Sequence, residues 1–136
     1  MDFNIRPLTE VDYENTLVGW WKDWRWTAPP KEFLPENGKG GIMVLDKKTP
    51  VCAGFVYMTN SKVAWVDFII SNVKYKDRPK RKDALELLIN TLTNISKDSG
   101  NKFCYALIKN KSLMNTYKKL GYTAADSYTQ EMIKKL

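Results

Sequence analysis

The stretch from residue 63 to residue 108 constrains the fold most, because it reads as a strand, a helix and a strand in succession. Residues 63–70 are apolar almost throughout, which is typical of a mid-sheet strand buried on both faces. The next apolar residues recur at helical spacing and form one stripe: Leu85, Leu88, Ile89, Leu92 and Ile95. Residues 103–108 read as a strand again. The pattern predicts two strands of one sheet joined by a helix that packs on its face.

The rest of the chain adds elements of shorter range. Residues 3–6 alternate as a strand does, and a helical stretch follows, with Thr9 or Asp12 as its cap. A loop rich in Pro and Gly spans residues 28–41. A hairpin of residues 42–45 and 50–58 precedes the central strand. A short helix begins after Asn110 and ends at Gly121, and residues 129–133 are expected to form a last strand. We therefore expect one α+β domain over residues 1–136, with a mixed, mostly antiparallel sheet flanked by helices in three layers.

Composition excludes several kinds of chemistry. The chain has 136 residues, a formal net charge of +7, no histidine and two cysteines. Without histidine, a Ser-His-Asp or Cys-His mechanism is ruled out, and we expect no metal site. No apolar run is long enough to cross a bilayer and no signal segment is visible, so we expect a cytoplasmic protein without a membrane partner. The positive charge suits a phosphorylated cofactor, an acidic substrate or a nucleic acid, and does not choose among them.

The segment from Asn110 to Tyr122 carries the clearest family resemblance. It places an Asn after a strand, Tyr117 seven residues later, and Gly121 followed by an aromatic residue at a helix end. This spacing, together with the element order from Phe3 onward, resembles the GNAT (GCN5-related N-acetyltransferase) family. Seven residues are about two helical turns, so Asn110 and Tyr117 can face one cleft. Asn110 could equally be only a helix cap, and Tyr117 only a core residue.

The resemblance implies roles for residues of the central strand and the short helix. In the family the pantetheine arm of acetyl-coenzyme A inserts between two splayed strands, here those of residues 63–71 and 103–108. Backbone groups of Ile69, Ile70 and Ser71 would bind that arm, with help from Asn110. Tyr117 would protonate the leaving thiolate, and Asp67 would act as the base. Glu36 is a weaker candidate for the base. A salt bridge at the sheet margin is the structural alternative for Asp67.

One loop departs from the family pattern. GNAT proteins usually carry an Arg/Gln-x-x-Gly-x-Gly/Ala loop, whose backbone amides close on the cofactor's pyrophosphate. Residues 75–85 contain no glycine here, although they are rich in cations. The residues that we expect to contact the cofactor in this region are Lys76, Arg78, Lys80, Arg81, Lys82 and Asp83. A solvated loop, or a contact with nucleic acid, are the alternatives for this basic run.

A tryptophan-rich segment lies where the family shapes its acceptor site. Four of the five tryptophans fall within residues 20–26. Trp20 and Trp24 share a helical face, so at least this pair is expected to pack on the sheet. Trp21, Trp24 and Trp26 are the candidate substrate-binding residues. Residues 26–30 resemble a segment of small phage-encoded GNAT-like proteins, which would place the protein in a host cytoplasm.

Taken together, the sequence predicts an N-acetyltransferase that uses acetyl-coenzyme A and a small-molecule or protein amine, with a homodimer left open. The alternatives are a GNAT-fold protein without catalysis that binds another protein and, as the weaker one, a basic nucleic-acid binder. The basic loop lacks interleaved aromatic residues, so a surface that stacks on single-stranded nucleic acid is not indicated.

Overall fold

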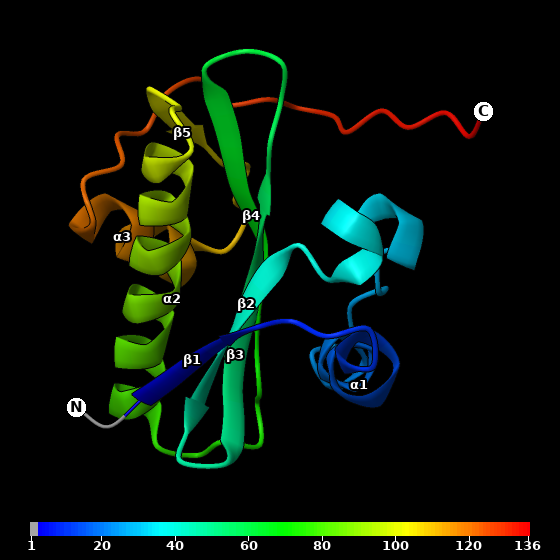
Figure 1. Cartoon of the computed structure of the whole chain (residues 1–136), viewed down its shortest axis with the longest axis vertical. Helices are drawn as coiled ribbons and strands as arrows, with labels where there is room; N and C mark the ends of the chain where they lie inside the picture. Colours follow the sequence, from blue (N-terminus) through cyan, green and yellow to red (C-terminus); the bar gives the residue numbers. More distant parts are fainter. Residues whose placement is uncertain (1–2) are drawn as a thin grey trace.

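A five-stranded sheet with helices on both faces forms the body of the molecule (Figure 1). The computed structural model describes residues 3–136. The strands are β1 (Phe3–Pro7), β2 (Gly41–Asp46), β3 (Thr49–Tyr57), β4 (Val63–Ser71) and β5 (Phe103–Tyr105), in that order across the sheet. β1 to β4 pair antiparallel, and β5 joins β4 in parallel. The predicted mixed, mostly antiparallel sheet flanked by helices is confirmed.

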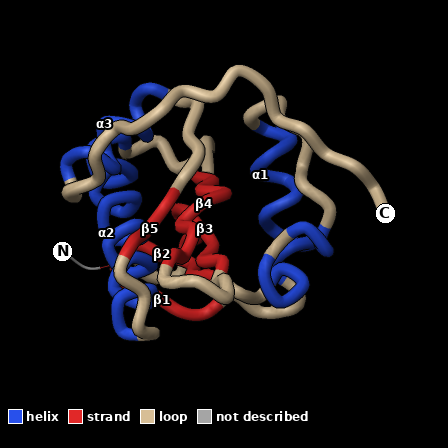
Figure 2. Tube along the Cα trace, turned by 90° about the horizontal axis from the view of Figure 1, so that it is seen from above, coloured by secondary structure: helices blue, strands red, loops and turns tan. Residues whose placement is uncertain are grey.

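The helices divide between the two faces of the sheet. α2 (Arg78–Asp98) and α3 (Lys111–Lys119) lie on one side, and α1 (Val18–Asp23) lies on the other, as the view from above shows (Figure 2). A π-helical turn, η1 (Tyr13–Leu17), leads into α1, and two 3₁₀ turns, η2 (Lys31–Phe33) and η3 (Pro35–Gly38), follow it. Among residues 3–136, no helix is long and apolar enough to cross a bilayer.

Two apolar cores follow from this arrangement. The predicted stripe of α2 supplies Leu88, Ile89 and Leu92, all fully buried, to the core on its side of the sheet. Trp20 and Trp21 of α1 fill the core on the opposite side. β4 contributes side chains to both cores, because Val66 belongs to the first core and Ile70 to the second. The prediction that this strand is buried on both faces is thus confirmed at these positions.

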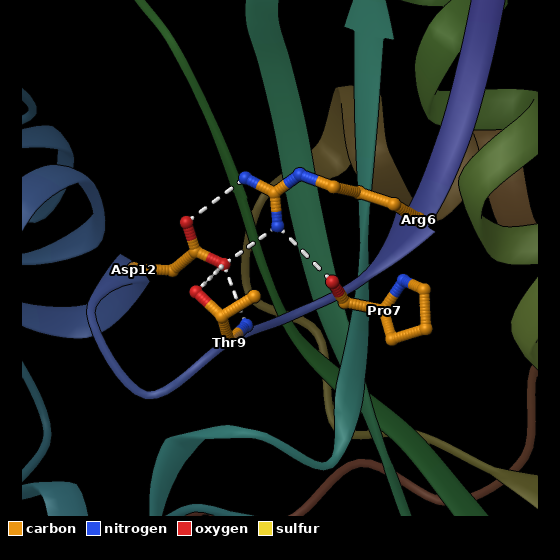
Figure 3. A network of polar contacts seen from close by, with 4 residues as sticks. All are labelled: Arg6, Pro7, Thr9 and Asp12. Carbon is orange, nitrogen blue, oxygen red and sulfur yellow. Dashed lines mark hydrogen bonds and ion pairs between the residues drawn. The ribbon is translucent and has the colours of Figure 1, made fainter.

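The entry to the first helical segment differs from expectation. Asp12 makes no capping bond to the helix that follows it. Its carboxylate, 5% exposed, instead accepts two hydrogen bonds from the Arg6 guanidinium, at 2.8 and 3.0 Å (Figure 3). It also accepts from the backbone amide of Thr9 at 2.7 Å and from its hydroxyl at 3.2 Å. Asp12 is thus the N-cap residue, as predicted, but without a side-chain capping bond, because the side chains of Asp12 and Thr9 fix the turn between β1 and the helix instead.

The C-terminal part of the sheet is also shorter than predicted. β5 ends at Tyr105 instead of residue 108, and the last strand expected at residues 129–133 is absent. Met132 and Ile133 are 84% and 67% exposed. A strand needs a partner edge for its backbone, and Figure 1 shows the end of the chain running away from the sheet. Local propensity alone therefore predicted this element wrongly.

Candidate functional site

A bulge interrupts the pairing of β4 with β3 near the middle of β4. Asp67 pairs with Phe55 and Ile70 pairs with Ala53, so β4 has one more residue than β3 between these pairs. Phe68 absorbs the extra residue with φ of 53°, a left-handed conformation that is uncommon for a bulky side chain. On the other edge, β4 pairs with β5 only from Val63 to Trp65. Beyond that point the two chains separate.

Asp67 lies in the gap between the separating chains. Its carboxylate accepts a hydrogen bond from the backbone amide of Leu107 at 3.1 Å and from that of Phe68 at 2.9 Å. Burial raises the pKa of this carboxyl above its ordinary value, although the two amide bonds act in the opposite direction. Among the described residues, no Lys or Arg forms an ion pair with Asp67. The salt-bridge alternative is therefore wrong, and the carboxylate is neutralised only by backbone dipoles.

Tyr117 closes the bottom of the same gap. It projects from α3, is 2% exposed, and its hydroxyl donates to the backbone carbonyl of Val66 at 2.7 Å. Burial, with the nearby Asp67 charge, raises the pKa of this phenol above its ordinary value, so the hydroxyl keeps its proton. The ring packs edge-on against Tyr122, with the centroids 4.9 Å apart. Tyr117 is thus both a core residue and a proton donor aimed at the β4 backbone.

A cleft of about 460 Å³ extends along the open edge of β4. Its walls come from four parts of the chain, and its lining residues are Trp24, Trp26, Ile69, Ser71, Arg78, Arg81, Lys82, Leu85, Asn110, Ser112, Leu113 and Thr116. Asn110 stands at its edge as the cap of α3, with its side-chain oxygen accepting from the Leu113 amide at 2.9 Å. Thr116, not Tyr117, lines the cleft from α3. The expectation that Asn110 and Tyr117 face one cleft is therefore wrong.

The tryptophans divide differently from the prediction. Trp21 is 4% exposed and belongs to the core, so its assignment to a substrate surface is wrong. Trp24 follows the end of α1, and its indole N–H donates to the carbonyl of Ser71 at 2.7 Å. Trp26, 47% exposed, stacks on Trp24 with ring centroids 5.6 Å apart. This stacked pair forms one wall of the cleft.

The charged residues predicted to contact the cofactor, which lie just before α2 and in its first two turns, have unequal roles. Arg78, Arg81 and Lys82 line the cleft, whereas Lys76, Lys80 and Asp83 are not among its lining residues. The Arg81 guanidinium donates to the carbonyl of Tyr75 at 3.0 Å and lies 5.9 Å from the Trp24 ring. It therefore fixes the loop against the tryptophan pair. Of the backbone positions predicted to face the cofactor, Ile69 and Ser71 line the cleft, and Ile70 is 1% exposed in the core.

The first turn of α2 is closed by its own residues. Asp77 is the N-cap, and its carboxylate accepts from the backbone amide of Lys80 at 3.1 Å. Pro79, in the first turn, has no backbone N–H to offer. The sequence prediction missed this use of Asp77, although an Asp two residues before a Pro is a helix-start signal.

A second cavity, also of about 460 Å³, lies beside the end of β3. Its lining residues include Pro35, Val56, Tyr57 and Met58. Glu36, the weaker candidate base, supplies the one carboxylate among its lining residues. Burial raises the pKa of Tyr57 above its ordinary value, and the nearby Asp67 charge adds to the effect.

Comparisons with known proteins identify the fold through solved structures. No protein-family model matches the chain, and no curated protein sequence matches it. Solved structures do. Glucosamine-6-phosphate N-acetyltransferase from Arabidopsis thaliana matches 98% of this chain and 100% of its own, with a TM-score of 0.67 and 10% identity. The ribosomal-protein-S18-alanine N-acetyltransferase from Escherichia coli matches 91% of this chain and 79% of its own, with a TM-score of 0.67 and 14% identity.

A third match carries a bound ligand. N-acetylglutamate synthase from Neisseria gonorrhoeae, complexed with coenzyme A and N-acetyl-glutamate, matches 91% of this chain and 29% of its own, with a TM-score of 0.72 and 11% identity. All three matches are acetyltransferases or an N-acetyl amino acid synthase. The chain therefore has the fold of the GNAT acetyltransferases, as its element order predicts.

Proposed function

We propose that this protein transfers an acetyl group from a pantetheine thioester, such as acetyl-coenzyme A, to an amine. The observation that carries the proposal is the separation of β4 from the chain after β5, where the Asp67 carboxylate and the Tyr117 phenol both reach the backbone beside β4 residues that line the cleft. The fold, shared with proteins that are acetyltransferases, supports it. The amine acceptor would approach from the side of Tyr57 and the second cavity, opposite the cleft that would hold the thioester.

The residues present fit one part of coenzyme A and not another. Leu85, Leu113 and Ile69 give the cleft apolar walls, and Ser71 and Asn110 give it polar groups, as a pantetheine arm with two amides requires. The diphosphate does not fit the start of α2, because Asp77 occupies the Lys80 amide there and Pro79 lacks one.

The thioester supplies the activated acetyl group, and the residues around the gap handle the protons. Asp67 takes the proton of the attacking amine, and its raised pKa makes it a stronger base than an exposed aspartate. Tyr117 gives a proton to the departing sulfur after its hydroxyl turns from the carbonyl of Val66. The backbone amide of Phe68, which donates to Asp67 in this structure, would turn to the thioester oxygen and stabilise its developing charge.

Thiol release tests the proposal. The purified protein is incubated with acetyl-coenzyme A or S-acetyl phosphopantetheine and a panel of primary amines, and free thiol is measured. We expect amine-dependent release, lowered about 10²-fold or more in Asp67→Asn. Asp126→Asn, an exposed position in the C-terminal segment, is the matched control and should keep the rate. The absence of amine-dependent release with both donors would refute the proposal.

A second candidate is a protein-binding module without catalysis. The buried hydroxyl of Tyr117, already bonded to Val66, and the exposed ring of Trp26 favour it. It predicts that Trp26→Ala abolishes capture of a partner, whereas Asp67→Asn leaves that capture intact. The opposite pattern would exclude it.

A further inference from the structure

The start of α2 offers little to a diphosphate. A helix N-terminus binds phosphate through backbone amides that have no partner within the helix. Here the Lys80 amide is bonded to the Asp77 carboxylate and Pro79 has no amide hydrogen, so Arg78 is the one residue among the first three of α2 whose amide has no hydrogen bond within the described chain. The Asp77 carboxylate also carries a negative charge at the point where a phosphate would sit. Both effects weaken anion binding at this place.

The positive charge around the cleft is located elsewhere, on exposed side chains. Arg78 and Lys82 line the cleft and are exposed, and the exposed Lys76 precedes them in the chain. Lys109 and Lys111 are also exposed and are the sequence neighbours of the cleft residue Asn110. We refer to these five residues as the cationic rim. None of them forms an ion pair with a described residue.

Long, exposed cations at a cleft and next to its lining residues in the chain suit a large acidic partner better than a small ligand buried in the cleft. Exposed charges act mainly through long-range attraction, which guides a partner of opposite charge and weakens as salt rises. The formal net charge of +7 acts in the same direction. The cleft itself has room and polarity for a pantetheine arm. The cationic rim would therefore meet whatever carries that arm.

We propose that the acetyl donor is the phosphopantetheine arm of an acidic carrier protein, and not free acetyl-coenzyme A. The inference rests on the proposed acyl transfer and deepens it. The arm enters the cleft, its single phosphate meets the cationic rim, and the carrier's acidic surface covers the rim. The amine nitrogen attacks the thioester carbon, the C–N bond forms and the C–S bond breaks. The amine proton goes to Asp67, and the sulfur leaves as the carrier's thiol with a proton from Tyr117.

Three donors that share one thioester test the inference: acetyl-coenzyme A, S-acetyl phosphopantetheine, and an acidic acyl carrier protein loaded with acetyl phosphopantetheine. We expect kcat/KM for the first two to agree within about threefold, because the adenosine diphosphate part gains no helix amides. We expect the carrier protein to exceed both by about tenfold or more at low salt and to lose this advantage at high salt.

Each other result overturns the inference. If acetyl-coenzyme A exceeds S-acetyl phosphopantetheine by about tenfold or more, the diphosphate is recognised after all. If the carrier protein is no better than S-acetyl phosphopantetheine, the cationic rim does not bind it. Turnover with none of the three donors refutes acyl transfer itself and the inference with it, whereas turnover with the small donors alone leaves the proposed function standing.

Two sets of variants test separately whether the cationic rim binds the carrier protein and whether the α2 cap keeps phosphate out. Lys109→Glu with Lys111→Glu should lower the ratio of carrier kcat/KM to S-acetyl phosphopantetheine kcat/KM by about tenfold. The control, Lys134→Glu with Lys135→Glu, changes the net charge equally in the C-terminal segment and should leave the ratio within about twofold.

The second set of variants tests whether the α2 cap weakens phosphate binding. Asp77→Gly with Pro79→Ala frees one amide, restores another and removes the charge. This variant should raise kcat/KM for acetyl-coenzyme A relative to S-acetyl phosphopantetheine by about tenfold. An unchanged ratio in the lysine variant contradicts carrier binding by the cationic rim, and an unchanged ratio in the Asp77 and Pro79 variant contradicts the role of the α2 cap. Melting followed by circular dichroism verifies that each variant folds.

Discussion

The Tyr117 hydroxyl has a structural partner, and removing it distinguishes a structural from a chemical role. Tyr117→Phe keeps the ring in its buried site and deletes only the group that donates to the Val66 carbonyl at 2.7 Å. Leaving that carbonyl without its donor in a site only 2% exposed costs about 1–2 kcal/mol of the free energy of unfolding. For a chain of this length that corresponds to a melting temperature lower by about 3–8 °C.

The catalytic effect is much larger if the hydroxyl is the acid. Loss of a general acid lowers kcat by about 10²–10⁴-fold, whereas a stability loss of this size leaves nearly all of the protein folded at the assay temperature. Melting followed by circular dichroism gives the first quantity. Thiol release at saturating acetyl-coenzyme A or S-acetyl phosphopantetheine gives the second. The two readouts are independent, because kcat is measured per folded molecule.

Tyr122→Phe is the matched control. Its ring touches that of Tyr117, and its hydroxyl is bonded to Thr93 Oγ1 at 2.6 Å, away from β4. We expect a stability loss of about 1 kcal/mol or less and an unchanged kcat. If Tyr117→Phe keeps kcat within about twofold of the parent, the acid role is refuted. If both variants lose kcat equally, packing around α3 explains the loss.

Three further predictions concern titration and packing. The Arg6 guanidinium lowers the pKa of Asp12, so this carboxylate stabilises the fold above its unfolded pKa of about 3.9 and loses the effect as pH falls through the folded value. Urea unfolding should therefore show Asp12→Asn less stable at about pH 7, with the difference from the parent disappearing near pH 2. Gly54→Ala places a Cβ against Ile69 Cδ1 and 3.0 Å from Leu92 Cδ1, and should cost about 1–3 kcal/mol by the same measurement. Because burial raises the pKa of Asp67, the acid limb of the rate–pH profile should lie above about pH 3.9 and be absent from any residual rate of Asp67→Asn.

The parts of the fold that the sequence predicts are those where one periodic signal dominates. The α2 stripe of Leu88, Ile89 and Leu92 is such a signal, and it is buried as expected. Residues 129–133 have strand-forming side chains, yet β5 ends at Tyr105 and no strand forms there. Strand formation depends on a partner edge elsewhere in the chain, and a local pattern carries no information about it.

The tryptophan segment shows what its helical spacing predicts and what it does not. The i, i+4 rule places Trp20 and Trp24 on one face, and Trp24 indeed packs against the core that contains Trp20. Although α1 ends at Asp23, the Trp24 amide still donates to the Trp20 carbonyl at 3.1 Å, and its indole N–H reaches Ser71. The π-helical turn before α1 has more residues per turn than an α-helix and so changes the angle between successive side chains. Trp21 is buried beside Trp20. The composition of the segment thus predicts its importance and not the role of each ring.

The Asn110–Tyr117 spacing has a similar explanation. Seven residues bring two side chains onto one face only if both belong to the helix. Asn110 has φ of −74° and ψ of 121°, outside the helix, because it caps α3. Its side chain lies at the cleft, while Tyr117, inside the helix, turns toward the β4 backbone. Asn110 therefore lies at the cleft, whereas Tyr117 lies at the gap beside β4. In the proposed reaction that separation is useful, because one end of a pantetheine arm must be held while a proton is delivered at the other.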